Sequence, residues 1–314
     1  SHTRLRRRSK DAQETVFAER HGRRRAALEV SDEVTSNTET WVRQAKEGSR
    51  EALEALVRQI QEPVYGLSLR MLGHPADAED AAQEILIKVI THLDGFREES
   101  AFSTWVYRIA ANHLLSTRKG RMKRLNLDFE LYESHVSKEG EGAGVASGST
   151  PDQALLIEET RASCMQGLLQ CLSRELRLAF ILGQVFEVTS EQGAYILGIT
   201  PAAFRKRLSR GRVGIRRFLT RNCGLVRPDN PCSCARQAVY DIEVGWIDPD
   251  HPRYADPRTS AERRDDIRDR LRELDEMGRV AALFRAYPGR GPSETFVGLV
   301  KELLDSGRYR LLVE

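Results

Sequence analysis

Residues 77–93 of the chain, DAEDAAQEILIKVITHL, predict an amphipathic helix around which the N-terminal half is built. Apolar residues recur at helical spacing from Ala78 to Leu93 and form one wide stripe. Acidic residues fill the first half of the helix, where the positive end of the helix dipole favours negative charge. Gly95 is expected to end the helix. Because the sequence from about 38 to 120 also has a helical pattern, the stripe should pack against neighbouring helices.

The composition of the whole chain restricts the class of protein. Its 314 residues are enough for two or three domains, and 40% of them are hydrophobic. Lys and Arg number 49 and Asp and Glu 46, so net charge says little about partners. No stretch approaches the roughly 20 apolar residues that cross a bilayer, and no apolar signal-peptide core follows the basic N-terminus. Five cysteines without disulfide-framework spacing fit a reducing compartment, so we expect a cytoplasmic protein with no membrane partner.

Shifts in composition divide the chain into five parts, and the predicted fold class is all-α because no convincing strand pattern occurs. The first part is basic and poor in apolar residues; we expect a disordered tail, with a non-specific nucleic-acid contact as the alternative. The third part has six acidic residues against a single lysine between 126 and 152, which predicts a flexible acidic linker. The parts are the tail (1–37), a helical domain (38–124), the linker (125–152), a second helical domain (153–222) and a mostly helical extension (223–314).

Residues 189–201, TSEQGAYILGITP, predict a short helix, a glycine-containing turn and a second helix. Thr200 is well placed to cap the second helix, and Pro201 suits its first position. This order is typical of a helix-turn-helix. Five apolar residues are expected to hold the two helices together: Ala194, Leu197, Ile199, Phe204 and Leu208.

The second helix of this pair is strongly basic. Eight Arg or Lys residues and no acidic residue lie between 201 and 221. Such a helix fits a polyanion, with its early residues at base edges in a major groove and its later ones at phosphates. The alternative is a basic face that is merely solvated. The candidate DNA contacts are Ala203, Phe204, Arg205, Lys206, Arg207, Arg210 and Arg212.

Three stretches resemble signatures of RNA polymerase sigma factors of the extracytoplasmic-function type. Asp77–Glu84 and Phe102–Asn112 resemble two parts of region two, and Leu208–Arg212 resembles the end of the region-four recognition helix. The resemblance covers roughly residues 38–221. It implies two helical sigma domains joined by an acidic linker, binding to core RNA polymerase and promoter DNA, and a role in transcription initiation.

The resemblance also implies roles for individual residues. Two polymerase sites are implied, the clamp helices of the largest subunit and the flap; the residues for the clamp helices are Asp77, Asp80, Gln83 and Glu84. The residues implied for the −10 side of the promoter are Trp105, Arg108, Asn112, Arg118 and Lys119. The loop Asp94–Ala101 would form a pocket for one flipped base, and the linker would follow the active-site cleft and RNA exit path. Trp105 and Tyr107 fit a place in the core equally well.

Two other function classes compete with this interpretation. A stand-alone helix-turn-helix regulator would account for residues 189–218 but not for the ordered signatures at 77–84 and 102–112. An enzyme has little support, because the sequence has no phosphate loop, nucleophile motif or metal-hydrolase pattern. We therefore expect a binding protein that acts through polymerase and is not an enzyme.

The C-terminal extension lies beyond the resemblance and opens with a group of cysteines. The candidate ligands for zinc or another soft metal are Cys223, Cys232, Cys234 and His251. The cysteine spacing, C-x8-C-x-C, is no standard zinc motif. The alternatives are small buried apolar residues or reactive free thiols. Cys164 and Cys171 lie seven apart on a predicted helix and are expected in the core.

Two further helices with apolar stripes are predicted in the extension, at roughly 259–286 and 294–305, the second capped by Ser293. Their stripes must pack on something. They could pack on each other as a small domain, or onto the promoter-binding domains. In the second case the extension would be an internal inhibitor that takes the place of a separate anti-sigma protein.

Overall fold

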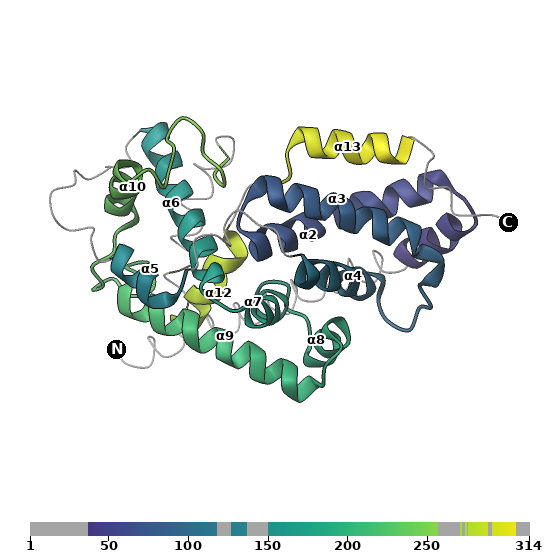
Figure 1. Ribbon diagram of the computed structural model, residues 1–314, viewed down its shortest axis with the longest axis horizontal. Coiled ribbons are helices and arrows are strands. Elements are labelled where there is room, and N and C mark those ends of the chain that lie inside the picture. Colours follow the sequence, from purple (N-terminus) through teal and green to yellow (C-terminus); the bar gives the residue numbers. More distant parts are fainter. Residues whose placement is uncertain are drawn as a thin grey trace, which may run out of the picture.

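A computed structural model gives the arrangement of the chain, and its described part consists of helices and loops (Figure 1). Within that part, the one strand-like contact is a β-bridge between Cys223 and Cys232, so the all-α prediction is confirmed. Among the described helices, none has the length and apolar character of a bilayer-spanning segment. The described residues are 37–117, 127–136, 150–256, 271, 274, 276–287 and 291–305.

Three long helices form the N-terminal domain: α2 (Arg50–Leu72), α3 (Pro75–Thr91) and α4 (Phe102–Ser116). The Ser49 side chain caps the start of α2, and Gly73, with φ of 77°, ends it in a left-handed conformation. The chain then turns at once into α3, whose apolar stripe is fully buried against α2 and α4. The predicted helix is therefore present, although it starts at Pro75 and ends at Thr91, and a single 3-10 turn over Leu93–Gly95 follows it.

The second domain contains α6 (Pro151–Gln170), α7 (Arg174–Phe180), the π-helical turn η3 (Ile181–Val185), α8 (Ser190–Leu197) and α9 (Pro201–Asn222). Thr189 and Gln192 form a reciprocal capping box at the start of α8. Gly198, with φ of 62°, makes the turn, and the Thr200 side chain accepts a hydrogen bond from the Ala203 N–H to cap α9. The helix-turn-helix prediction is thus confirmed.

The linker contains a helix that the sequence interpretation missed, α5 (Phe129–Val136). Its aromatic side chains pack on α9: the ring centroids of Phe129 and Tyr132 lie 6.3 and 5.5 Å from that of Phe218. These residues and Val136 form an apolar stripe at positions i, i+3 and i+7, which the surrounding acidic residues obscured. Residues 137–149, including the glycine-rich run, lie outside the described residues, as do the tail to residue 36 and the basic cluster with Arg118 and Lys119.

The extension packs onto both domains through α10 (Cys234–Glu243), α12 (Glu276–Ala286) and α13 (Glu294–Asp305). Helix α12 contacts η3 and α9 of the second domain, and Figure 1 shows α13 running alongside α3 of the N-terminal domain. Phe284 of α12 contacts Phe180 edge to face, with centroids 5.1 Å apart. The Ser293 hydroxyl accepts a hydrogen bond from the Phe296 N–H, as expected for the N-cap of α13. The two apolar stripes therefore lie against the sigma-like domains. The predicted helix start at 259 lies outside the described residues.

Gly193 gives a test of the packing inside the helix-turn-helix. A Cβ at this position would stand 2.3 Å from the ring of Phe204, which is itself fully buried and has no room to retreat. We expect Gly193→Ala to lower the free energy of unfolding by about 1–3 kcal/mol, as overpacked cores do. The measurement is urea denaturation followed by circular dichroism. Gly95→Ala, where nothing lies within 4 Å of the added methyl group, is the control and should stay close to wild type.

Candidate nucleic-acid interface

The basic side chains of α9 form one open face of the helix-turn-helix. Arg205, Lys206 and Arg210 are exposed, and Arg207 and Ala203 are partly buried. Arg212 is also exposed, and its Nε donates a 2.7 Å hydrogen bond to the Gln184 side chain in η3. This arrangement presents cationic groups along one side of a helix, as contact with a phosphate backbone requires.

Phe204 does not belong to this open face. Its side chain is fully buried and lies over Gly193 of α8. The DNA contact expected of Phe204 therefore does not fit its position, whereas its expected role in holding the two helices together does. Position 204 falls one turn inside the N-cap on the face that meets α8, so the helical register separates it from Arg205 and Lys206.

An open pocket of about 440 Å³ lies between α3 and α4, beside the loop Asp94–Ala101. Trp105 forms part of its wall, half-buried, with its ring 5.3 Å from Phe96 and 5.9 Å from Phe102. Trp105 is thus both a core contact and an accessible aromatic surface. The residues lining the pocket are Lys88, His92, Gly95, Trp105, Ile109, Asn112, His113 and Ser116.

The face of α4 that carries Tyr107 and Arg108 contacts the second domain. The ring of Tyr107 lies 5.2 Å from that of Phe186, and the Arg108 guanidinium stands 4.6 Å over the ring of Tyr195 in α8. Burial raises the pKa of Tyr107 to about 12, so this phenol stays protonated at neutral pH. A residue expected to touch promoter DNA, Arg108, therefore contacts the helix-turn-helix domain.

Buried polar groups reinforce this contact at the C-terminal end of α2. Arg177 of α7 donates hydrogen bonds to the carbonyl oxygens of Met71 (2.5 Å), Leu169 (2.7 Å) and Leu172 (3.0 Å), and burial lowers its pKa to about 10. Arg70 of α2 donates to the carbonyl oxygens of Phe284 and Tyr287 at the end of α12, at 3.4 and 3.3 Å. The C-terminal end of α2 thus forms hydrogen bonds with both the second domain and the extension.

The loop that follows α10 is held by a buried carboxylate. Glu159 of α6 accepts hydrogen bonds of 2.7–2.9 Å from the N–H groups of Arg253, Tyr254 and Ala255. The Tyr254 hydroxyl in turn donates a 2.5 Å bond to the carbonyl of Gly73, between α2 and α3. The extension therefore bridges the two domains through polar contacts that are shielded from water, where such bonds are strongest.

The acidic helix α3 carries the groups predicted to meet polymerase. Asp80 and Glu84 are exposed, and Asp77 and Gln83 are partly buried. Helix α13 lies beside this face: the Ser293 N–H donates a 3.0 Å bond to the Glu79 side chain. Phe296 of α13 is buried with its ring 6.1 Å from that of Tyr65 in α2. The extension therefore occupies the flank of the acidic surface and leaves Asp80 and Glu84 open.

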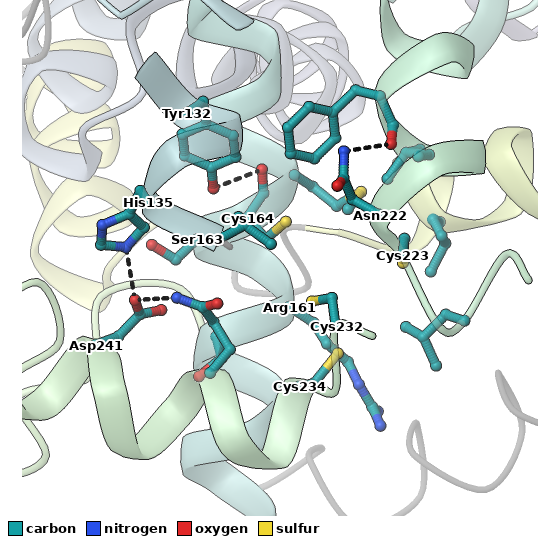
Figure 2. Close-up of a pocket in the computed structure, with 18 of the residues that line it drawn as sticks. Tyr132, His135, Arg161, Ser163, Cys164, Asn222, Cys223, Cys232, Cys234 and Asp241 are labelled. Carbon is teal, nitrogen blue, oxygen red and sulfur yellow. Dashed lines mark hydrogen bonds and ion pairs between the residues drawn. The ribbon is translucent and has the colours of Figure 1, made fainter. Parts of the chain in front are cut away.

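Four thiols line one small cavity in the second domain and the extension: Cys164, Cys223, Cys232 and Cys234 (Figure 2). Burial raises the pKa of Cys223 to about 12, and burial also raises the pKa of Cys164 well above its ordinary value. His251 is not among the lining residues. Its side chain is 84% exposed and pairs with Asp248, with 3.1 Å between Nδ1 and the carboxylate. Among the described residues, no group of three or more His, Cys, Asp or Glu side chains could hold a metal ion.

Comparison with known proteins matches the N-terminal domain to the family model of sigma-70 region 2, over residues 56–124. The chain is 30% identical over 181 residues to the ECF RNA polymerase sigma factor SigW of Bacillus subtilis, covering 57% of this chain and 94% of that protein. It is 31% identical to the RNA polymerase sigma-H factor of Pseudomonas aeruginosa, covering 57% and 91% of the two chains. Against the ECF RNA polymerase sigma-E factor of Escherichia coli the identity is 30%, with 59% and 95% covered.

Among solved structures, the chain is similar to one described as CnrH in complex with the cytosolic domain of CnrY. The sequence identity is 20%, the TM-score is 0.42, and 59% of this chain and 97% of that chain are covered. About two fifths of the chain falls outside the matches to these three relatives and to this solved structure.

His113 predicts a pH dependence of the N-terminal domain. Its Nδ1 accepts a 2.7 Å hydrogen bond from the Lys88 ammonium, and burial, followed by the charge of Lys88, lowers its pKa. Below the ordinary histidine pKa the unfolded chain therefore takes up a proton more readily than the folded chain. The free energy of unfolding consequently decreases as the pH decreases. We expect the urea midpoint to be lower at about pH 5.5 than at about pH 7.5.

The variant His113→Asn keeps an acceptor near Lys88 but cannot take up a proton in this range, so it should flatten that dependence. His251→Asn removes an exposed histidine and serves as the control. An unchanged pH profile in His113→Asn would contradict the assignment.

Proposed function

The chain belongs to the extracytoplasmic-function family of RNA polymerase sigma factors, and we propose that its C-terminal extension holds the free protein in a closed, inhibited form. As a member of this family it binds core RNA polymerase and promoter DNA and directs transcription initiation. A stand-alone helix-turn-helix regulator would leave the region 2 match unexplained. A cytoplasmic location is part of the proposal.

We assign the exposed carboxylates Asp80 and Glu84, with Asp77 and Gln83 beside them, to the clamp helices of polymerase. Trp105 and Asn112 in the open pocket, together with Arg108, would face the −10 element, as would Arg118 and Lys119 further along the chain. The open basic face of α9, with Arg205, Lys206 and Arg210 in front, would face the −35 element.

The single observation that carries the closed form is the direct contact between α4 and α8. The −10 and −35 elements are about 25 base pairs apart, or about 85 Å at 3.4 Å for each pair. The Arg108 guanidinium and the Tyr195 ring, one on each DNA-binding domain, are 4.6 Å apart. Two surfaces in contact cannot read elements so far apart at the same time. The domains must therefore separate before the protein can engage a whole promoter.

The closed form has enough contacts to be favoured by several kcal/mol. Aromatic pairs such as Tyr107 with Phe186 are worth about 0.5–1.5 kcal/mol beyond their buried area. Hydrogen bonds from charged donors, here Arg177 to Met71 and Arg70 to α12, are worth about 1.5–3 kcal/mol each. A preference of a few kcal/mol leaves the open form at roughly 0.1–10% of the population. Polymerase would select that minor form.

Phe296 tests the inhibitory role of α13. Its side chain is 2% exposed and seats α13 on the N-terminal domain. Phe296→Asp would bury a carboxylate against Tyr65, so α13 should detach. Truncating a buried Phe costs about 3–5 kcal/mol, so we expect affinity for core polymerase to rise about tenfold or more. The measurement is fluorescence anisotropy with labelled protein and core enzyme.

The matched control is Val297→Asp, one residue along the same helix, where the side chain is 41% exposed. It should leave affinity close to wild type. Equal affinities in both variants and the wild type would rule out inhibition by α13, and weaker binding by Phe296→Asp alone would make the extension a positive element.

Asp80 tests the polymerase contact. In the Phe296→Asp background, Asp80→Arg should lower affinity for core polymerase about tenfold or more, because it puts a positive charge where a complementary negative one is proposed. Glu62→Arg reverses an equally exposed acidic residue on α2, outside the proposed surface, and is the control. If the two charge reversals weaken binding equally, the contact is not at α3 and only overall charge matters.

A further inference from the structure

Helix α5, which lies within the linker, packs closely into the second domain beside α9 (Figure 1). Two glycines leave room for its aromatic rings. A Cβ on Gly214 of α9 would stand 3.0 Å from the ring of Phe129, and a Cβ on Gly167 of α6 would stand 2.7 Å from the ring of Tyr132. The Tyr132 side chain is buried as a result. The second domain therefore has a fitted seat for this helix.

The extension also holds α5. The Nε2 atom of His135, near the end of α5, lies 2.9 Å from the Asp241 carboxylate of α10 (Figure 2). The His135 ring stacks on that of Trp246, with centroids 4.1 Å apart. The side chains of His135 and Asp241 are 14% and 8% exposed, so water is largely excluded from their contact, which strengthens it. Helix α5 is thus bound by the second domain and by the extension at once.

The position of α5 limits how far apart the two DNA-binding domains can move. The chain connects them from Ser116, the last residue of α4, to Pro151, the first residue of α6. When α5 is free, this connection can reach about 100 Å, even if α5 stays helical. When α5 is fixed to α9, only the stretch from Ser116 to Phe129 can extend, and it reaches about 45 Å at most.

The shorter connection is not enough for a promoter whose two elements lie about 85 Å apart. Helix α4 from Arg108 to its end, and α9 from Arg205 to Gly214 beside α5, cover about 25 Å of that separation at 1.5 Å per residue. The connection must then span roughly 60 Å, or roughly 50 Å if the reach of the side chains is included. A free α5 permits this distance, whereas a fixed α5 does not.

We propose that α5 is a restraint on domain separation, and that it must leave α9 before the two DNA-binding domains can bind one promoter. Through His135 and Asp241, α10 of the extension keeps α5 on α9 and so keeps the connection short. The proposal rests on the closed form of the free protein described above. It assigns a role to α5 and α10, whose contacts are separate from those of α12 and α13 with the domains.

The direct experiment measures distances between pairs of spin labels by pulsed electron paramagnetic resonance. The labels are carried by genetically encoded keto amino acids, because the chain has native cysteines. One pair, at the exposed positions Leu131 and Arg217, reports whether α5 stays on α9. A second pair, at the exposed positions Glu62 of α2 and Arg217, reports the separation of the domains.

Both distances are measured in the free full-length chain and in its complex with core polymerase and promoter DNA. We expect both to increase in the complex, the one between α5 and α9 by about 20 Å or more. Separation of the domains with an unchanged distance between α5 and α9 would overturn the restraint alone. If the domains did not separate, the closed form itself would be wrong and the restraint with it.

An insertion tests the consequence for transcription. About 12 Gly and Ser residues between Leu125 and Asn126 would lengthen the shorter connection by about 40 Å. Helix α5 could then stay on α9 while both elements are bound. Transcription by the reconstituted holoenzyme should rise about threefold or more, since even one aromatic pair that no longer has to be broken is worth that factor.

The matched control carries the same insert between Gly142 and Ala143, after α5. It gives a chain of equal length and leaves the shorter connection unchanged, so transcription should stay close to wild type. Equal transcription with the two insertions would contradict the restraint.

Asp241→Ala tests the part played by the extension. The loss of the His135 partner should speed amide hydrogen exchange in α5 about tenfold in the free chain. Asp248→Ala, which removes the partner of the exposed His251, is the control and should leave that exchange unchanged. Unchanged exchange in α8 shows that the second domain of each variant is folded. Equal exchange of α5 in the two variants would overturn the role of α10.

Discussion

The C-terminal end of α2 is the junction on which the closed arrangement depends. A helix end leaves carbonyl groups without partners, and a buried guanidinium needs acceptors. Here buried side-chain donors satisfy these carbonyl groups. Arg177 donates to Met71, Tyr254 donates to Gly73, and Arg70 donates to the carbonyl groups at the end of α12. Separating the domains exposes all of these groups together. These hydrogen bonds are thus stable while water is excluded from the junction. They can be replaced once water or polymerase offers other hydrogen-bond partners.

Local chemistry explains what could be predicted from the sequence. The helix-turn-helix follows from Thr189, Gly198 and Thr200, each of which acts within a few residues of itself. Helix α5 escaped prediction because its short apolar stripe lies among acidic residues and is stabilised by Phe218, far along the chain. From the sequence, Cys164 could be predicted only as a core residue of a helix. Its place beside Cys223 depends on how α6 crosses α9, and no spacing in the sequence encodes that crossing.

Arg108 serves both the closed form and the proposed DNA contact. Its guanidinium suits the ring of Tyr195 as well as it suits phosphates and unstacked bases. Neither use requires a dedicated inhibitory residue in α4. A substitution at Arg108 would consequently loosen the closed form and weaken promoter contact together. The extension differs in this respect, because Phe284 and Phe296 have no part in the proposed DNA surface.

The order of the elements along the chain determines when the closed form can first appear during synthesis. Both DNA-binding domains precede residue 223, whereas α12 and α13, which cover them, come after residue 275. At about 5–20 residues per second, a ribosome needs several seconds to make the remainder after α9 is complete. During that interval the nascent sigma domains have no extension to close them. Under the proposed inhibition, a newly made molecule would meet polymerase before its inhibitory extension exists, and activity would follow the rate of synthesis as well as the amount of finished protein.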